Sequence, residues 1–378
     1  MKKIAIITEL SLKSTNYGNN IQAYALNKFL RLKFPDYTVE TILLKKGTGR
    51  KITSFIFYVK RIVRKVVLLT RKKKDETINV KKKSFNDFVA KYIITSHNDY
   101  TFKELKSSNY DFYIVGSDIV WIQSRGFVNK SKFLAFTPKL RNAKKIAYAA
   151  SFGENNIPPE NEKSIKKYLS KFNALSVREY ESIKFLNKHG ISGVQHVCDP
   201  VLLLSRDEWD TVSEDVNNIS AYEKNKFAFV YIIGPNKHEN EINNICKQFG
   251  IQPIFVSCTK QTFNEIGEFK CFDNCSPQEW IWMIKHSEFV FTDSFHGLVF
   301  STIFQKRFFV INRRNNKNLN IRMSDYLCKI EETDKLVDIT HIGSLSNYSW
   351  NYNKIKKNMD AFIKVSQDFL LNSLECMS

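Results

Sequence analysis

The stretch FVFTDSFHGLVFSTIF, from Phe289 to Phe304, changes its hydrophobic period halfway along. Its first four residues are apolar or β-branched, and they predict a short buried strand. From Ser294 onward the apolar residues recur every three or four positions, which predicts an amphipathic helix. The chain therefore passes from strand to helix at Thr292-Asp293-Ser294, as it does in the repeating unit of α/β proteins.

The same junction is a candidate site for chemistry. The start of a helix offers free backbone N–H groups and a partial positive charge, which together favour an anion such as phosphate or carboxylate. His296 falls in the first turn, where its ring can act as a base or as a hydrogen-bond donor toward a bound group. The alternative interpretation is that Asp293 or Ser294 is an ordinary N-cap and that His296 is a packed core residue.

Strand and helix signals alternate along most of the 378 residues, a length that suits two domains. The polar stretch 213–226 is the best candidate for a linker between two α/β halves. We predict an α/β fold with these divisions: 1–212 as an N-terminal Rossmann-like domain with an insertion at 50–92, 213–226 as the linker, 227–350 as a C-terminal Rossmann-like domain, and 351–378 as a last amphipathic helix.

The chain is strongly basic, and its positive charge is concentrated in one segment. Its 58 Lys and Arg against 38 Asp and Glu give a formal net charge of +20, and residues 45–83 hold 15 basic and 2 acidic residues. A basic amphipathic helix is predicted at 55–74. It either packs on the domain with a solvated basic face or binds an anionic membrane surface through residues 55–83. Nucleic acid is not expected as a partner, because aromatic residues are not interleaved with the basic ones.

We expect a cytoplasmic protein, peripheral at the inner face of the membrane if the basic segment binds lipid. No apolar run reaches the roughly 18–20 residues of a spanning helix, and the opening residues MKKIAIITEL lack the features of a secretory signal. The seven cysteines are an odd number at irregular spacing, so we expect them to be reduced and packed. They do not form the paired CxxC pattern of a zinc site, and no metal is predicted.

Ligands of open parallel sheets bind at the carboxyl ends of the strands. Applied to this chain, the rule nominates the loops at 16–20, 116–121, 151–153, 178–179, 199, 234–237, 293–296 and from 313 onward. Arg178 and Arg313 follow predicted strands, so each is either an anion clamp or an ordinary surface arginine. Trp121 either stacks on a sugar ring or fills the core. The loop NYGNN matches neither GxGxxG nor an NTPase phosphate loop, which disfavours a dinucleotide or NTPase site.

Six segments spread over the chain form an ordered set of motifs. They are NYGNNIQAYAL (16–26), YDFYIVGSDIVW (110–121), KKIAYAASFG (144–153), LSVREYES (175–182), CDPVLLL (198–204) and TDSFHGLVFSTIF (292–304). Together they resemble the polysaccharide pyruvyl transferase family. The resemblance implies a GT-B-like fold, in which two Rossmann-like domains with parallel sheets face a central cleft and a C-terminal helix crosses back. It also places the acceptor in the N-terminal domain and the donor in the C-terminal one.

The resemblance implies an activity as well. Family members transfer the pyruvyl group of phosphoenolpyruvate onto two hydroxyls of a sugar, forming a cyclic ketal in a bacterial capsule or exopolysaccharide or its lipid-linked precursor. The expected partners are phosphoenolpyruvate and a sugar or lipid-linked oligosaccharide, with no required cofactor or metal. The competing hypotheses are a nucleotide-sugar glycosyltransferase of similar fold and a non-enzymatic basic scaffold that binds glycan-lipid or nucleic acid.

The family motifs also imply site residues in this chain. His296 and Arg178 are the expected catalytic residues. The expected donor-binding residues are Arg178, Ser294, Phe295, His296, Gly297, Arg313 and Arg322. The expected acceptor-binding residues are Asn16, Tyr17, Gly18, Asn19, Gln22, Gly116, Ser117, Asp118, Trp121 and Ser151. Ile119 and Ile122 stand where family members commonly carry Gln and Asn, so the acceptor loop lacks two polar side chains.

Overall fold

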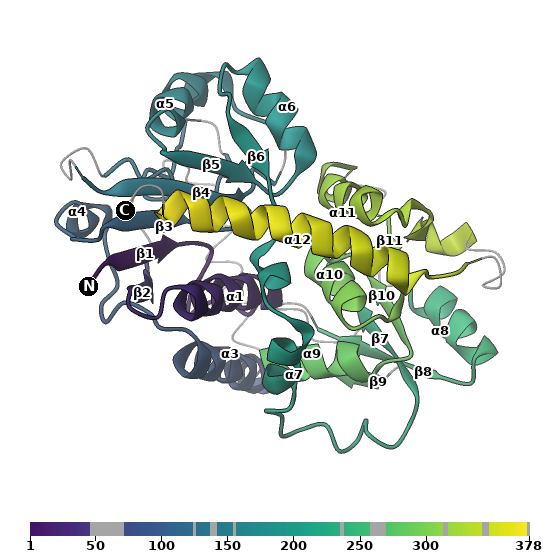
Figure 1. Ribbon diagram of the computed structural model, residues 1–378. Helices are drawn as coiled ribbons and strands as arrows, with labels where there is room; N and C mark the ends of the chain where they lie inside the picture. The colour runs from purple at the N-terminus through teal and green to yellow at the C-terminus, as the bar shows by residue number, and fades with distance from the viewer. Residues whose placement is uncertain are drawn as a thin grey trace, which may run out of the picture.

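The computed structural model describes residues 1–45, 72–123, 126–136, 142–153, 156–234, 238–257, 270–312, 317–341 and 348–375. Within them, the chain forms two six-stranded parallel sheets flanked by helices, in two halves that lie side by side (Figure 1). The predicted α/β architecture is therefore confirmed. The basic helix predicted at 55–74 lies mostly outside the described residues.

The first half is built on a sheet with the strand order β2-β1-β3-β4-β5-β6. Its strands are β1 (Lys3–Ile7), β2 (Thr38–Thr41), β3 (Phe112–Val115), β4 (Lys144–Ala150), β5 (Ala174–Val177) and β6 (Val194–His196). Strands β3 and β4 are buried over almost their whole length, as expected for a parallel sheet covered on both faces. Beyond the end of β3, Asp118 forms an isolated bridge with Ala150, so the ends of β3 and β4 stay together.

The second half contains a sheet with the order β12-β11-β10-β7-β8-β9. Its strands are β7 (Phe227–Tyr231), β8 (Gln252–Val256), β9 (Lys270–Phe272), β10 (Phe289–Thr292), β11 (Arg307–Ile311) and β12 (Leu336–Val337). Strand β10 lies between β7 and β11, and the helix predicted after it is present. Sequence patterns do not reveal β9 and β12, because three and two residues carry no detectable period.

Helices connect and cover the strands. They are α1 (Tyr17–Lys33), α3 (Lys72–Tyr92), α4 (Phe102–Leu105), α5 (Pro159–Leu169), α6 (Tyr180–Lys188), α7 (Arg206–Ser213), α8 (Glu239–Gln248), α9 (Pro277–His286), α10 (Phe295–Ile303), α11 (Lys317–Ile330) and α12 (Tyr352–Glu375), with short 3₁₀ turns η2 (Pro200–Leu203), η3 (Thr333–Lys335) and η4 (Ile339–His341). Helix α9 begins with a capping box, in which Ser276 Oγ accepts from Glu279 N–H at 3.2 Å and Glu279 Oε2 accepts from Ser276 N–H at 2.7 Å. In the part of the chain that is described, no helix is long and apolar enough to cross a membrane.

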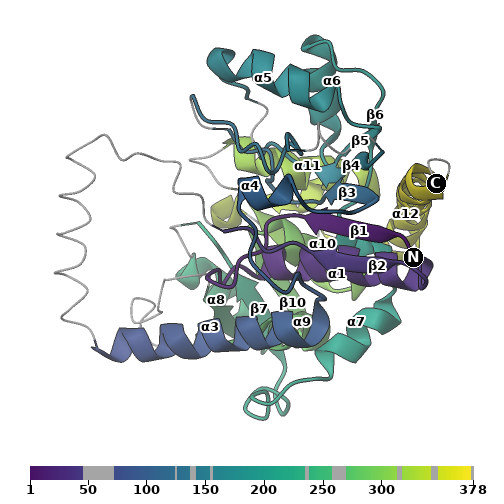
Figure 2. The ribbon, with the colours of Figure 1, turned by 90° about the vertical axis from the view of Figure 1, so that its left-hand side faces the viewer.

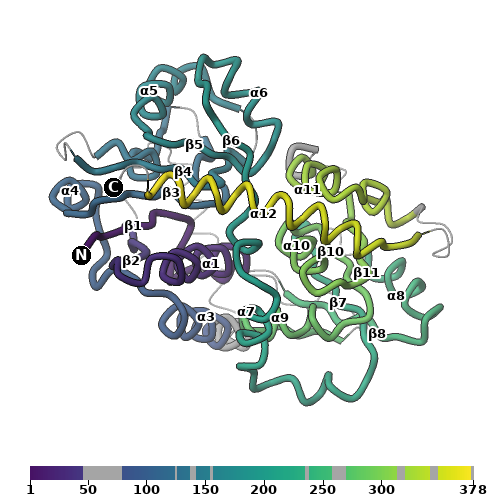
Figure 3. The backbone as a smooth tube through the Cα atoms, viewed as in Figure 1, coloured from purple at the N-terminus to yellow at the C-terminus, as the bar shows by residue number. Residues whose placement is uncertain are grey.

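The last helix, α12, runs from the second half back over the first (Figure 3). At its start, Lys354 Nζ lies 2.6 Å from Glu331 Oε2 at the end of α11. Farther along, Ser366 Oγ accepts a hydrogen bond from Cys198 N–H at 2.8 Å, and the ring of Phe369 packs against Tyr148 of β4. The predicted crossing back is therefore confirmed, and it ties the two halves together on one side.

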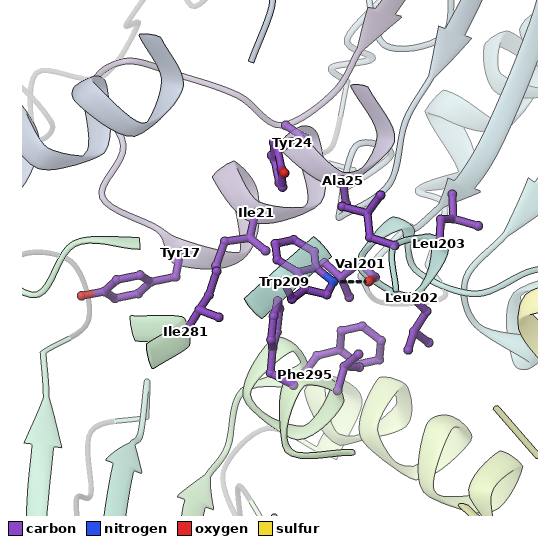
Figure 4. Packing of buried hydrophobic residues seen from close by; sticks show 14 of the residues in the cluster. Tyr17, Ile21, Tyr24, Ala25, Val201, Leu202, Leu203, Trp209, Ile281 and Phe295 are labelled. Atoms are coloured by element: carbon purple, nitrogen blue, oxygen red, sulfur yellow. Dashed lines mark hydrogen bonds between the residues drawn. The ribbon is translucent and has the colours of Figure 1, made fainter. Parts of the chain in front are cut away.

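One of the three apolar clusters in the described residues continues from one half into the other. Figure 4 shows part of it, with Tyr17 and Ile21 of α1 beside Ile281 of α9, and Trp209 near Phe295. Trp209 donates from Nε1 to the Val201 carbonyl at 2.9 Å. The ring of Tyr17 stacks on Trp280 of α9 with 5.4 Å between ring centroids. Because α1 belongs to the first half and α9 to the second, their packing joins the halves directly.

Helix α3 joins the halves on another side (Figure 2). Its Lys81 is only 3% exposed, and its Nζ donates to the Ser257 carbonyl at 2.6 Å and to Ser257 Oγ at 2.9 Å. The same ammonium lies 4.9 Å from the centroid of the Tyr17 ring. Ser257 follows β8 in the second half, so a lysine of the basic insertion spans the joint. Nothing in the sequence distinguishes Lys81 from the other lysines around it.

Replacing Lys81 should weaken this joint. Truncation in Lys81→Ala leaves the buried Ser257 carbonyl and hydroxyl without the ammonium, and we expect a loss of about 1–3 kcal/mol in the free energy of unfolding. Urea denaturation measures this free energy of unfolding. The matched control is Lys83→Ala, because Lys83 is exposed on the same helix, and its free energy of unfolding should change by no more than about 0.5 kcal/mol. Equal stability of the two variants would contradict the role given to Lys81.

Candidate active site

Polar side chains gather where the carboxyl ends of the first sheet meet the N-termini of α1 and α10. They come from the ends of β3, β5 and β6 and from the first turn of α10: Ser117, Asp118, Arg178, Glu179, Asp199 and His296. All six are at least nine-tenths buried. The loops nominated from the sequence after these strands therefore do converge, and they converge at the joint between the halves.

The sequence TDSFHG builds the start of α10. Thr292 Oγ1 donates to the Tyr231 carbonyl at 2.7 Å and accepts from Ser294 N–H at 3.0 Å, while Ser294 is the N-cap and its Oγ accepts from Gly297 N–H at 3.5 Å. A Cβ on Gly297 would lie 2.5 Å from Thr292 Oγ1, so only glycine fits. These contacts fix the direction in which His296 leaves the helix.

Asp293 has a structural task in the same turn. Its two carboxylate oxygens accept from the backbone N–H groups of Ile233 and Gly234, at 2.6 and 2.8 Å. These N–H groups belong to the loop that follows β7, the neighbour of β10 in the sheet. The carboxylate therefore holds the ends of two strands in place and is only 2% exposed.

The ring of His296 lies between the two halves. Its Nε2 is 3.6 Å from Asp199 Oδ2 and makes no hydrogen bond within the described residues. Its Nδ1 faces Gly18 in the first turn of α1, where a Cβ would come well inside 3.0 Å of the ring. The close approach of the ring therefore requires glycine at position 18. His296 itself is only 6% exposed.

Arg178 is enclosed by three carboxylates. Its Nε donates to Glu179 Oε1 at 3.0 Å, its Nη1 donates to Asp199 Oδ2 at 2.8 Å, and its Nη2 lies 3.9 Å from Asp118 Oδ1. The guanidinium carbon lies 4.6 Å from the centroid of the Phe295 ring. Burial lowers the pKa of Arg178, but these carboxylates more than offset it, so the side chain stays charged. Only Nη2 has no hydrogen-bond partner among the described residues.

Asp199 connects Arg178 with His296. It is 1% exposed, and its Oδ2 also accepts from Ser117 Oγ at 3.0 Å, while its Oδ1 accepts from Val201 N–H at 3.2 Å. Burial alone would raise the pKa of this carboxyl, but His296 and Arg178 hold it well below its usual range. The sequence nominated Asp199 and Glu179 by position only and gave neither a role. Both directly follow strands, and that was the available signal.

The first turn of α1 is fixed against the same strands. Gln22 Nε2 donates to Thr8 Oγ1 and to the Asn19 carbonyl, both at 2.9 Å, and Thr8 Oγ1 lies 3.0 Å from the Ser117 carbonyl, to which it donates. Asn16 is the N-cap of α1, and its Oδ1 accepts from Asn19 N–H at 3.4 Å. Of the expected acceptor residues on α1, only these two asparagines remain partly exposed.

Two aromatic residues expected to contact the acceptor lie in the core. Trp121 is completely buried, stacks on Phe133 and donates from Nε1 to the Lys132 carbonyl at 3.0 Å. Tyr17 is completely buried and donates to the Cys275 carbonyl at 2.8 Å. The expectation of ligand contacts is corrected for both rings, because their large apolar surfaces are used in packing. For Trp121, the core-filling alternative is the one that the structure supports.

The remaining expected residues fall at different distances from the cluster. Gly116 packs against Leu26 and Thr8, and Ser151 Oγ accepts from Gly153 N–H at 2.9 Å. Arg313 lies outside the described residues. Arg322 lies one turn before Tyr326 on α11, and the Tyr326 ring packs against Phe295.

Comparison with known proteins identifies the family of the chain. A sequence profile described as polysaccharide pyruvyl transferase matches residues 16–315. The chain belongs to the polysaccharide pyruvyl transferase family and is therefore a transferase. A search of curated proteins finds no match.

Solved structures with the same overall fold are sugar-nucleotide enzymes. UDP-GlcNAc 2-epimerase from Neisseria meningitidis, bound to UDP-GlcNAc, has a TM-score of 0.52 at 11% identity over 98% of this chain and 100% of that one. The enzyme of the same name from Methanocaldococcus jannaschii has a TM-score of 0.53 at 12% identity, over 96% of this chain and 92% of that one. A co-structure of S. aureus MnaA with UDP has a TM-score of 0.51 at 12% identity, over 99% of this chain and 98% of that one. At such identities the likeness shows the fold alone, and that fold is GT-B.

The contact between Gly18 and His296 yields a prediction. Alanine for glycine in a helix is by itself stabilising by about 0.5–1 kcal/mol, so Gly18→Ala should lower stability only through the clash with the ring. We expect Gly18→Ala to reduce activity at least tenfold and to lower the melting temperature.

The matched control is the same substitution made in His296→Ala. There the clash is absent, and Gly18→Ala should no longer lower the melting temperature, as calorimetry measures. An equal loss in both backgrounds would contradict the proposed contact.

Proposed function

We propose that this protein transfers the pyruvyl group of phosphoenolpyruvate onto two hydroxyls of one sugar, as a cyclic ketal, in a bacterial surface polysaccharide or its lipid-linked precursor. The observation that supports the proposal most is the convergence of His296, Arg178 and two helix N-termini at one point. Such a point combines anion binding with a side chain able to move protons.

The reaction requires few groups. A proton is added to the methylene carbon of the enol, a sugar hydroxyl adds to the adjacent carbon, and that carbon then loses phosphate as the second hydroxyl closes the ring. Of the two protons that the hydroxyls give up, one balances the methyl group and the other leaves on phosphate. No redox change occurs, so no redox cofactor is required, and we propose no metal as part of the site. His296 is the proposed acid or base.

Charge decides how the donor is held. Asp118, Glu179 and Asp199 bring three negative charges against the single positive charge of Arg178, so these four side chains carry a formal net charge of −2. We propose that Arg178 orients the donor through Nη2 while the N-termini of α1 and α10 bind its anionic groups. We propose that Arg313 and Arg322 supply the further positive charge that phosphoenolpyruvate needs.

The acceptor is proposed to approach from the first half. Asn16 and Asn19 keep part of their side chains exposed beside the cluster, and amides of this kind hydrogen-bond sugar hydroxyls. Attachment to the inner face of the membrane through the basic segment 55–83 remains a proposal, and flotation with anionic vesicles tests it.

A nucleotide-sugar glycosyltransferase is the second candidate. It is favoured by one observation, namely that similar structures were determined with UDP-GlcNAc or UDP. Under that alternative, UDP would protect the protein from thermal unfolding and phosphoenolpyruvate would not.

The direct test is phosphate release from phosphoenolpyruvate in the presence of galactose-, mannose- and N-acetylmannosamine-containing acceptors. We expect acceptor-dependent release by the wild type, and a drop of about 10²-fold or more in His296→Ala. The exposed histidine in His97→Ala is the control and should leave the rate unchanged. Acceptor-dependent release that persists in His296→Ala would contradict the role of His296. No release with any acceptor, together with thermal protection by UDP and not by phosphoenolpyruvate, would overturn the proposed donor.

A further inference from the structure

We infer that Asp199 is a positioning residue for His296, and that Nδ1 of His296 is the atom that exchanges a proton with the substrate. The inference rests on the proposed function, because it specifies which side of the ring reacts. Its evidence is the way the carboxylate is held and the direction in which each ring nitrogen points.

The Asp199 carboxylate is fixed independently of His296. It directly precedes η2, where Oδ1 accepts from the Val201 N–H group, and Pro200 restricts the backbone that follows. Arg178 Nη1 and Ser117 Oγ both donate to Oδ2. Three donors from separate segments therefore hold this carboxylate in one orientation, so it can fix the orientation and the tautomer of the His296 ring beside it.

His296 Nε2 is the ring nitrogen directed at the Asp199 carboxylate, 3.6 Å from Oδ2. An ionised carboxylate only accepts hydrogen bonds, so the neutral ring is stabilised with its proton on Nε2. The lone pair then lies on Nδ1. The same relation, in which a buried carboxylate fixes the tautomer of a catalytic histidine, operates in hydrolases with a Ser-His-Asp triad.

Nδ1 points toward the first turn of α1, at Gly18, where the lack of a side chain leaves room for the ring. That turn belongs to the first half, whose loop carries the partly exposed Asn16 and Asn19. A group bound at the N-terminus of α1 would thus meet the lone pair of Nδ1. Asp199 and the reacting atom lie on opposite sides of the imidazole, as positioning requires.

The test is Asp199→Asn, examined by ¹⁵N NMR of histidine-labelled protein at a pH where the ring is neutral. Asparagine has the same shape but no negative charge, and its oxygen still accepts from Arg178 and Ser117. The preference for a proton on Nε2 should therefore weaken, and we expect a larger share of the Nδ1–H tautomer. His296→Gln identifies the signal. Turnover should fall about 10²-fold, and Asp199→Asn should add little to His296→Gln, because it acts through that ring.

Asp293→Asn is the matched control, since Asp293 is similarly buried, lies three residues from His296, and accepts from two backbone N–H groups of the loop after β7. It should leave the tautomer unchanged. An unaltered Nε2–H tautomer in Asp199→Asn, or a full additional loss in the His296→Gln background, would overturn the inference. The NMR result does not depend on the identity of the donor. If the wild type releases no phosphate from phosphoenolpyruvate but Asp199→Asn still shifts the tautomer, the proposed donor is rejected and the role of Asp199 is supported.

Discussion

The apolar core that continues through both halves is the constraint on which the site depends. Burial of each large side chain contributes about 1.5–3 kcal/mol, so separating the rings of Tyr17 and Trp280 alone would cost several kcal/mol. Helix α12 and Lys81 hold the same joint from other sides. His296 from the second half can therefore stay within reach of Asp199 and Gly18 from the first, although no covalent constraint brings them together.

Electrostatics within the joint follow from this closeness. A buried arginine among three carboxylates is stable only as a complete network, because removing one partner of a buried ion pair costs about 3–5 kcal/mol. Within the described residues, three buried atoms of the cluster make no hydrogen bond: Arg178 Nη2, Glu179 Oε2 and His296 Nε2. Buried groups without hydrogen bonds are costly, and these lie where the N-termini of α1 and α10 meet, which is the place where we propose that the donor binds.

Local patterns predicted what local interactions determine. The strand-to-helix turn at 292–294, the capping box of α9 and the convergence of loops at strand ends all follow from period, cap chemistry and parallel topology. The family motifs added His296 and Arg178. The choice between the two alternatives for Trp121 and the bridging position of Lys81 could not be predicted, because each depends on which distant segment packs against it. The partners of Asp199 come from three segments far apart in the chain, for the same reason.

The most direct test of the account is a crystal structure determined with phosphoenolpyruvate. The account predicts a bound molecule between the first turns of α1 and α10, within hydrogen-bonding distance of His296 and of Arg178 Nη2. Phosphoenolpyruvate bound elsewhere, with this cluster unchanged and a UDP soak filling the joint in its place, would contradict it.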